Sequence, residues 1–340
     1  MRKVLFLVML LVLVLIVPVT AAQDQPTFCG GLSETDCADL TAYEEANAAV
    51  DSAAFELALN LAMNMEGPNI AMDVTGSGAY SGAQALAGMA VDSADPMAML
   101  SADGIGSLLK AFNGDLDLTV SLPAEMTDGQ MPSSVHLHLM LVEGIGYIDF
   151  DALAETVPGV PYSGWGGLDL IALIDQLAPM MESMMEMGMG SVEAQMGGME
   201  QFADPAMFEE FISIARAQDV AGVFMYSFDF GALMQNEAMR DLIEQQMEAM
   251  GTDMGGMDLD TLLSVYDNMT MSAQVQYNGS SKMLERVTFN IAMDMSSLGV
   301  EGGLTMSGEM TFSGHDATTI AAPEGANIAP PEMLFGGMDM

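Results

Sequence analysis

Alternation of apolar and polar residues runs through much of this 340-residue chain. In FELALNLAMNM, the side chains of Phe55, Leu57, Leu59 and Leu61 fall on one side of an extended backbone, and glutamate, asparagine or alanine occupies most positions between them. A period of two with one apolar face predicts a half-buried strand. The turn at residues 66–69 and the following IAMDVTGSGAY predict the returning strand of a hairpin.

The same pattern predicts further antiparallel strands in both halves of the chain. DLDLTVSL and the segment from Val135 to Leu141 alternate in this way, and Glu143-Gly144 marks a tight turn before IGYIDF. VFMYSFDF predicts a strand with four aligned aromatic residues, Phe224, Tyr226, Phe228 and Phe230. MTMSAQVQY, LERVTFNIAMDM and GLTMSGEMTFSG predict three closing strands.

Helical spacing replaces the alternation in a few segments. Residues 39–52 are rich in alanine and predict a short helix, and LDLIALIDQLAPMMESMMEM carries an apolar stripe with period 3.6. Asp204-Pro205 predicts the start of another helix, with Phe208, Phe211, Ile212 and Ala215 on its apolar face. Further helices are expected near 236–250 and 258–266, whereas 81–110 and 151–167 predict mostly loop.

This order of elements contains no β–α–β alternation, so we do not expect a parallel doubly wound sheet. We expect an α+β fold, with one antiparallel sheet and helices against one face. Because strands from both ends of the chain would join the same sheet, we expect a single domain.

The charge and composition argue against two classes of protein, those that bind nucleic acids and those that are disordered. The chain has 48 acidic and 7 basic residues, a formal charge of −41, which repels nucleic acids and anionic lipid headgroups. Its hydrophobic fraction of 51% is too high for a disordered acidic protein.

The amino terminus predicts export. Residues 1–22 have a basic start, an apolar run and small residues for cleavage near Ala21-Ala22, as a signal peptide does. An uncleaved anchor is the alternative, and no later stretch is long and apolar enough to span a membrane. In an exported protein, Cys29 and Cys37 most simply form a disulfide; a metal site at this pair lacks nearby additional ligands.

No arrangement of residues in the sequence indicates catalysis, so we expect neither enzymatic activity nor a cofactor. Asp115 and Asp117 share a strand face, as do Asp149 and Asp151, and a solvated outer face explains them better than calcium binding. His136 and His138 also share a face. They could act as metal ligands, or they could lie exposed on the polar side of the sheet. We favour the polar surface, with no metal site.

Methionine is abundant, with 37 residues. Flexible thioether side chains suit an adaptable apolar surface, and clusters of them also bind Cu(I). Met184, Met185, Met187 and Met189 have suitable spacing for copper. However, methionines also occur on the apolar faces of the predicted strands, which favours packing or ligand contact.

The order of elements resembles the LolA/LppX-type lipoprotein carriers and lipid-binding envelope proteins. The features that carry the resemblance are the export signal, the opening helix with the long strand 55–66, the hairpin from Leu139 to Phe150, Trp165 before the mid-chain helix, and the closing segment from Ile320 to Pro323. The resemblance implies a curved antiparallel half-barrel with helices packed on its concave face and an apolar cavity between the two layers. We expect the chain to divide into signal peptide 1–22, disulfide-pinned segment 23–38, a single domain 39–322 and flexible tail 323–340.

We therefore expect an exported, non-enzymatic binding protein of the cell envelope for lipid or another apolar small molecule. The expected cavity residues are the inward strand positions and three residues of a helical lid. They are Phe55, Leu57, Leu59, Leu61, Leu116, Leu118, Val120, Leu137, Leu139, Phe224, Tyr226 and Phe228, with Ile174, Leu177 and Met181 in the lid. The acidic exterior favours a docking partner with a basic surface. A copper-binding envelope protein and a structural acidic surface protein remain the alternatives.

Overall fold

The structure is a computed structural model of the chain. It describes residues 27–64, 70–92, 101–123, 132–179, 209–217, 220–237, 240, 268–296 and 302–329. The signal peptide expected at 1–22, Met181 and the candidate copper ligands from Met184 to Met189 lie outside these residues.

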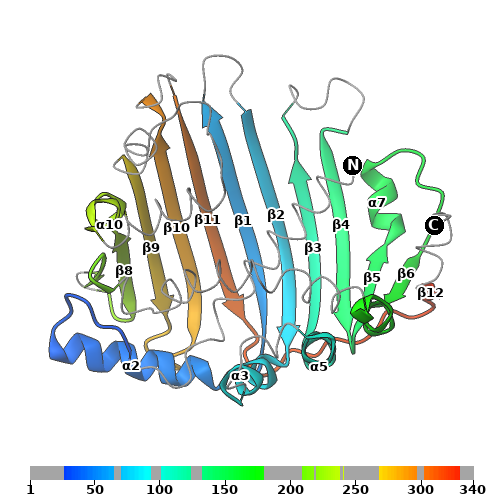
Figure 1. Ribbon diagram of the computed structural model, residues 1–340, viewed down its shortest axis with the longest axis horizontal. Coiled ribbons are helices and arrows are strands. Elements are labelled where there is room, and N and C mark those ends of the chain that lie inside the picture. The colour runs from blue at the N-terminus through cyan, green and yellow to red at the C-terminus, as the bar shows by residue number, and fades with distance from the viewer. Residues whose placement is uncertain are drawn as a thin grey trace.

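The described residues contain twelve strands in a single sheet, and Figure 1 shows that this sheet is open. In chain order the strands are β1 (Ser52–Asn64), β2 (Ile70–Ser81), β3 (Asn113–Ser121), β4 (Ser134–Val142), β5 (Ile145–Asp149), β6 (Trp165–Asp169), β7 (Ile212–Arg216), β8 (Val223–Phe228), β9 (Met269–Tyr277), β10 (Leu284–Asp294), β11 (Gly303–Ser313) and β12 (Asn327–Ala329). Their order across the sheet is β12-β6-β5-β4-β3-β2-β1-β11-β10-β9-β8-β7, and among these described strands only the β12–β6 pair is parallel. The predicted α+β class with one curved, mainly antiparallel sheet is confirmed.

The two halves of the chain meet in the middle of this sheet. β1 pairs with β11 from Ala54 opposite Ser313 to Asn64 opposite Gly303. This long pairing unites strands from both chain ends in one sheet.

The helices with described bounds lie mainly around one end and the margins of the sheet. They are α2 (Glu34–Ala48), α3 (Ala83–Asp92), α5 (Ala102–Ala111), α7 (Phe150–Thr156) and α10 (Phe230–Gln235). α2, α3 and α5 lie in a row across one end of the strands (Figure 1). Residues 170–179 are also helical, as the apolar stripe predicted. Within the described ranges, no helix combines the length and apolarity that crossing a membrane requires.

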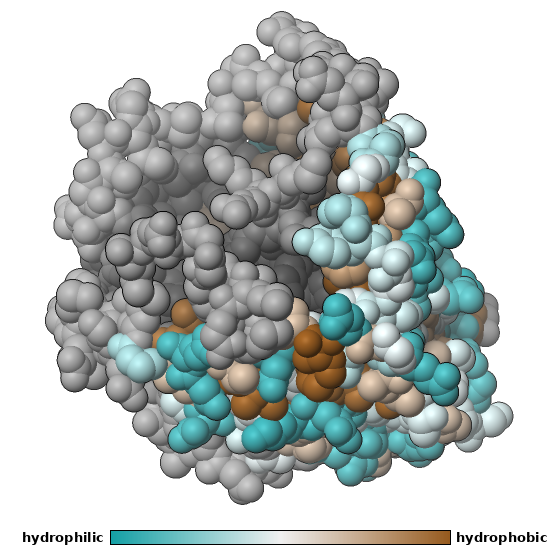
Figure 2. Space-filling model, turned by 90° about the vertical axis from the view of Figure 1, so that its right-hand side faces the viewer, coloured by the Kyte–Doolittle hydropathy of each residue, from teal (hydrophilic) through white to brown (hydrophobic). Residues whose placement is uncertain are grey.

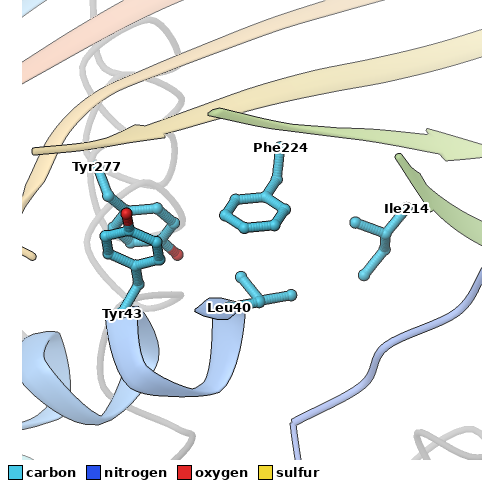
Figure 3. Packing of buried hydrophobic residues seen from close by; sticks show 5 residues of the cluster. All are labelled: Leu40, Tyr43, Ile214, Phe224 and Tyr277. Atoms are coloured by element: carbon cyan, nitrogen blue, oxygen red, sulfur yellow. The ribbon is translucent and has the colours of Figure 1, made fainter. Parts of the chain in front are cut away.

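α2 attaches to the sheet through a small aromatic core (Figure 3). Leu40 and Tyr43 point from the helix toward Ile214, Phe224 and Tyr277, and all five side chains are buried. Tyr43 stacks on Tyr277 with ring centroids 4.9 Å apart, and Phe224 meets both rings edge-on. This packing fixes α2 over the β7–β9 margin.

The segment before α2 protects the end of the sheet. Cys29 and Cys37 form the predicted disulfide. Inside the loop that it closes, the Gly30 carbonyl accepts a hydrogen bond from the Ile214 amide at 2.7 Å. Arg216 at the end of β7 lies 2.6 Å from Asp36 and 2.9 Å from Asp39. The N-terminal segment therefore covers the edge of β7, which would otherwise present unpaired backbone groups.

Several predicted elements differ from the structure. Ile212 and Ala215, predicted on a helix, belong to β7, because pairing with β8 outweighs a spacing that also suits a helix. Phe230 does not continue β8, since Asp229 caps α10 by accepting a hydrogen bond from the Ala232 amide. The expected loop 151–167 contains most of α7 and the start of β6. The expected loop 81–110 contains α3 and most of α5.

The C-terminal segment also differs in detail. Residues 327–329, within the tail expected from 323, form β12 beside β6. Gly167 of β6 has no side chain, and Tyr147 and Ile328 lie within 3.1 and 3.2 Å of the position where a Cβ atom would be. The absence of a side chain at Gly167 thus allows the close approach of this last strand.

Candidate ligand-binding face

The two faces of the sheet differ in chemistry. On one side of β1, Leu57 lies opposite Met310, which in turn lies opposite Val287. On the other side, Leu57 lies opposite Gly76, which in turn lies opposite Leu118. Because directly opposed residues of antiparallel strands point to the same side, these side chains form one continuous apolar face. We call the side that carries them the apolar face and the opposite side the polar face.

The register places all twelve predicted strand residues on the apolar face. Those near the α2 end and in β3–β4 are mostly buried, with Phe224 at 0% exposure and Leu118 at 2%. Others are half-buried; these are Phe55, Leu59, Leu61, Leu139, Tyr226 and Phe228. Ile174 and Leu177 of the predicted lid are half-buried in the helical segment 170–179.

Glycines keep parts of the apolar face shallow. At Gly308 of β11, an added Cβ atom would lie 2.5 Å from both Leu59 and the Phe289 ring. At Gly78 of β2, it would lie 2.5 Å from the Phe55 ring. The neighbouring side chains therefore lie over the glycine backbone instead of standing beside another side chain. The sequence alone does not reveal this feature, because it depends on the register between strands.

Methionines concentrate at the end of the apolar face away from α2. Met293 lies opposite Met269, and Met271 follows two residues later on the same face. In the neighbouring row, Met306 lies opposite both Ile291 and Leu61, and Leu61 lies opposite Met72. Met63 completes this group of six. The alternation in the sequence predicts their common face, but only the register reveals their proximity.

The α2 end has a polar margin. Burial raises the pKa of Glu44, which a hydrogen bond with Thr27 partly offsets. Burial also raises the pKa values of Tyr226 and Tyr277, and the nearby Glu44 carboxylate adds to both shifts. The two phenols therefore stay protonated and keep their ability to donate hydrogen bonds.

A hollow of about 670 Å³ lies on the other side of the sheet. Most of its lining residues belong to two rows of the polar face. The row between them also contributes, including Leu59 and Tyr226 of the expected cavity, although its side chains point to the apolar face. One of the rows consists of Ser213, Ser227, Ser272, Asn290, Ser307, Asn60 and Asp73. These hydroxyl, amide and carboxylate side chains are mostly exposed, as on a solvated surface. This hollow is therefore distinct from the predicted apolar cavity.

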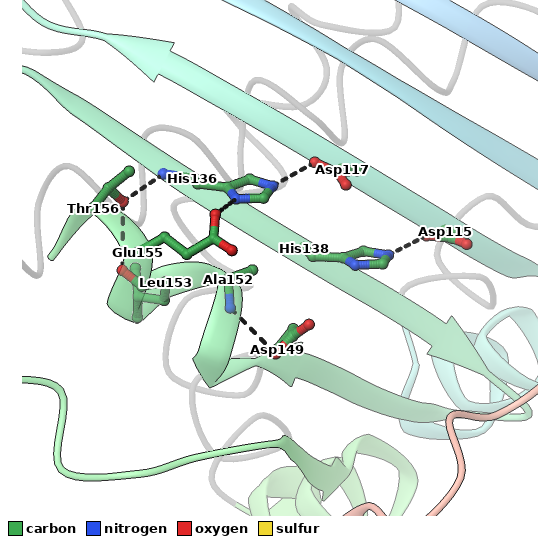
Figure 4. Close-up of polar contacts among 9 residues, drawn as sticks. All are labelled: Asp115, Asp117, His136, His138, Asp149, Ala152, Leu153, Glu155 and Thr156. Atoms are coloured by element: carbon green, nitrogen blue, oxygen red, sulfur yellow. Dashed lines mark hydrogen bonds and ion pairs between the residues drawn. The ribbon is translucent and has the colours of Figure 1, made fainter.

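The two strand histidines lie on this polar face, each beside an aspartate (Figure 4). His136 Nε2 lies 2.7 Å from Asp117 and its Nδ1 lies 3.3 Å from Glu155 of α7. His138 Nε2 lies 2.9 Å from Asp115. The predicted position on the polar side is confirmed, and both histidines have carboxylate partners. Among the described residues, no three His, Cys, Asp or Glu side chains are placed to hold a metal ion together.

α7 lies against the same face. The Thr156 hydroxyl accepts a hydrogen bond from the His136 amide at 2.9 Å, and Asp149 caps the start of the helix. The predicted Asp149/Asp151 pair is thus divided, because Asp149 caps α7 while Asp151 lies within it. Figure 2 views the molecule from the side of α7 and β6 and shows polar residues spread over much of the described surface, with apolar residues between them.

Comparison with known proteins gives matches only among solved structures. No protein-family model and no curated protein matches the chain. The lipoprotein LppX of Mycobacterium tuberculosis is 8% identical over 85% of this chain and 100% of LppX, with a TM-score of 0.27. LprF from Mycobacterium bovis is 11% identical over 86% of this chain and 97% of LprF, also with a TM-score of 0.27. The proposal below is drawn from the faces of this sheet alone.

Proposed function

We propose that this protein is an exported, non-enzymatic binding protein that holds a lipid or another apolar molecule against the apolar face of its sheet. The observation that carries the proposal is the continuity of that face from β8 through the centre of the sheet to β4. Few acidic side chains interrupt this face despite the formal charge of −41.

Burial of apolar area supplies the binding free energy. Each Å² of apolar surface removed from water contributes roughly 25 cal/mol, so a long acyl chain gains affinity without a specific polar contact. Half-buried residues such as Leu59, Leu61 and Phe228 are available to contribute this area. The shallow surface over Gly308 adds room for a chain-like ligand. Ile174, Leu177 and Met181 would contact the ligand from the helical side.

The polar margin suits an amphipathic ligand. Tyr226 lies on the apolar face and near Glu44 of α2, so phenol and carboxylate groups adjoin the apolar surface. In our proposal the ligand's polar end lies toward α2 and its apolar end toward the methionines. We further propose that the segment 1–22 directs export of the protein. The exported protein then docks on an envelope partner that has a basic surface.

Native mass spectrometry tests this function directly. The exported chain is purified without detergent and measured before and after extraction with organic solvent. We expect extra mass that extraction removes and that matches a lipid or another apolar molecule. The mass of the chain itself reports whether the segment 1–22 has been removed. A chain that carries no extra mass, and that does not take up added fatty acid after extraction, would contradict the proposal.

A further inference from the structure

The six methionines at the far end of the apolar face form a regular array. Across β9, β10, β11 and β1, one row reads Met269, Met293, Leu304 and Met63. The next row reads Met271, Ile291, Met306 and Leu61 on the same strands. Of the nine methionines in the described strands, only Met140 and Met225 lie on the polar face.

Three of these side chains occupy adjoining positions. Met269 and Met293 are directly opposed, and such pairs have Cβ atoms about 4.5–5.5 Å apart. Met271 is the next residue of β9 on the same face, diagonal to Met293 and within reach of a long side chain. Met has three rotatable side-chain bonds, so the three sulfur atoms can converge above the sheet. Met271 is 37% exposed and the other two are half-buried, so an ion from solvent can reach this group.

The chemistry of such a group selects a soft metal ion. Thioether sulfur favours Cu(I) over hard ions such as Ca²⁺ or Mg²⁺, which take oxygen ligands. The strongly negative charge of the chain raises the local concentration of cations. Both cysteines are in the disulfide, so no free thiol competes for the ion.

We propose that Met269, Met271 and Met293 form a thioether site for one Cu(I) ion on the apolar face. This site differs from Met184, Met185, Met187 and Met189, whose spacing in the sequence suits copper. It does not depend on lipid binding, since it requires only the three sulfur atoms.

A thioether site has a characteristic pH dependence. Cysteine and histidine ligands must lose a proton to bind a metal, so their affinity falls in acid. A thioether carries no proton to lose. Binding at this site therefore stays constant over a pH range in which a histidine or cysteine site would weaken.

The test is a Cu(I) titration of the extracted chain in competition with bicinchoninate, under nitrogen with ascorbate, which leaves the disulfide intact. Two triple variants are compared with the unmodified chain. Met269→Leu/Met271→Leu/Met293→Leu removes the site, and Met140→Leu/Met225→Leu/Met310→Leu removes the same number of thioethers elsewhere in the sheet. Leucine is close to methionine in volume, so both variants should keep the fold, which circular dichroism verifies.

We expect the first variant to bind one equivalent of Cu(I) fewer than the unmodified chain, and the control variant to bind as much as the unmodified chain. The equivalent that is lost should bind with the same affinity from about pH 5.5 to pH 8. Equal loss in the two variants, no loss in the first variant, or an affinity that declines with acid would each overturn the proposal.

Discussion

The Nε2 atom of His136 lies 2.7 Å from the Asp117 carboxylate across the β3–β4 pair. The other ring nitrogen of His136 faces Glu155 of α7 at 3.3 Å. Carboxylates accept hydrogen bonds and do not donate them, so only the doubly protonated imidazolium can donate to both partners. His136 is therefore a charge-dependent link between the sheet and α7.

This link predicts a pH-dependent contribution to stability. The hydrogen bond with Asp117, and then that with Glu155, raises the pKa of His136 above its ordinary value of 6.5. A raised pKa in the folded state stabilises the fold at low pH, and the benefit is lost as pH rises through the folded-state value. We expect His136→Gln to lower the free energy of unfolding below pH 6.5 and to have progressively less effect at higher pH.

Denaturant unfolding of both proteins over a series of pH values measures this difference. Asp117→Asn provides a second variant, because it removes the strongest partner and keeps the imidazole. It should reduce the same pH-dependent contribution. A destabilisation by His136→Gln that does not change with pH would contradict a role for the protonated ring.

The attachment of α2 predicts a large effect at Leu40. This side chain has 0% exposure and packs in the cluster with Tyr43, Ile214 and Phe224. Leu40→Ala should lower the free energy of unfolding by about 2–5 kcal/mol, because it removes buried methyl groups and leaves a cavity. Leu40→Met keeps the volume and should cost less than about 1.5 kcal/mol. Similar values for the two variants would show that α2 does not pack as described.

The disulfide predicts a moderate contribution. Cys29 and Cys37 are eight residues apart, and closing a loop of this size stabilises a fold by about 2–3 kcal/mol in the chain-entropy model. Cys29→Ser/Cys37→Ser should therefore lower the melting temperature. It should also speed hydrogen exchange at the Ile214 amide, which is bonded to Gly30. Unchanged exchange at Ile214 would mean that the loop covers β7 without the disulfide.

The sequence predicts the long strands well because their faces are chemically distinct. The alternation in β1 indicates the face of Leu57 and Leu59, and the register confirms that Leu118 shares it. β7 has only five residues, and Ile212 and Ala215 fit a helical spacing equally well. Local sequence therefore cannot distinguish the two structures, and pairing with β8 and Gly30 decides between them.

The contacts of the candidate site depend on register, which the sequence does not specify locally. His136 and Asp117 are 19 residues apart, and their contact follows from how β3 and β4 align. The same holds for the proximity of Met269 and Met293, and for the Phe289 ring over Gly308. The pattern predicts which side each residue faces, whereas its neighbours come from the folded sheet.

The most direct test of ligand binding on the apolar face compares two adjacent residues of β1. Leu61 lies on the apolar face and Asn60 lies on the polar face. Trp165, the one tryptophan of the chain, is replaced by phenylalanine, and a single tryptophan is then introduced by Leu61→Trp or by Asn60→Trp. Each extracted protein is titrated with a dibrominated fatty acid, which quenches tryptophan fluorescence at short range. Saturable quenching of the Leu61→Trp protein, with little quenching of the Asn60→Trp protein, is the result that we predict. Equal quenching of both proteins, or none in either, would contradict binding on the apolar face.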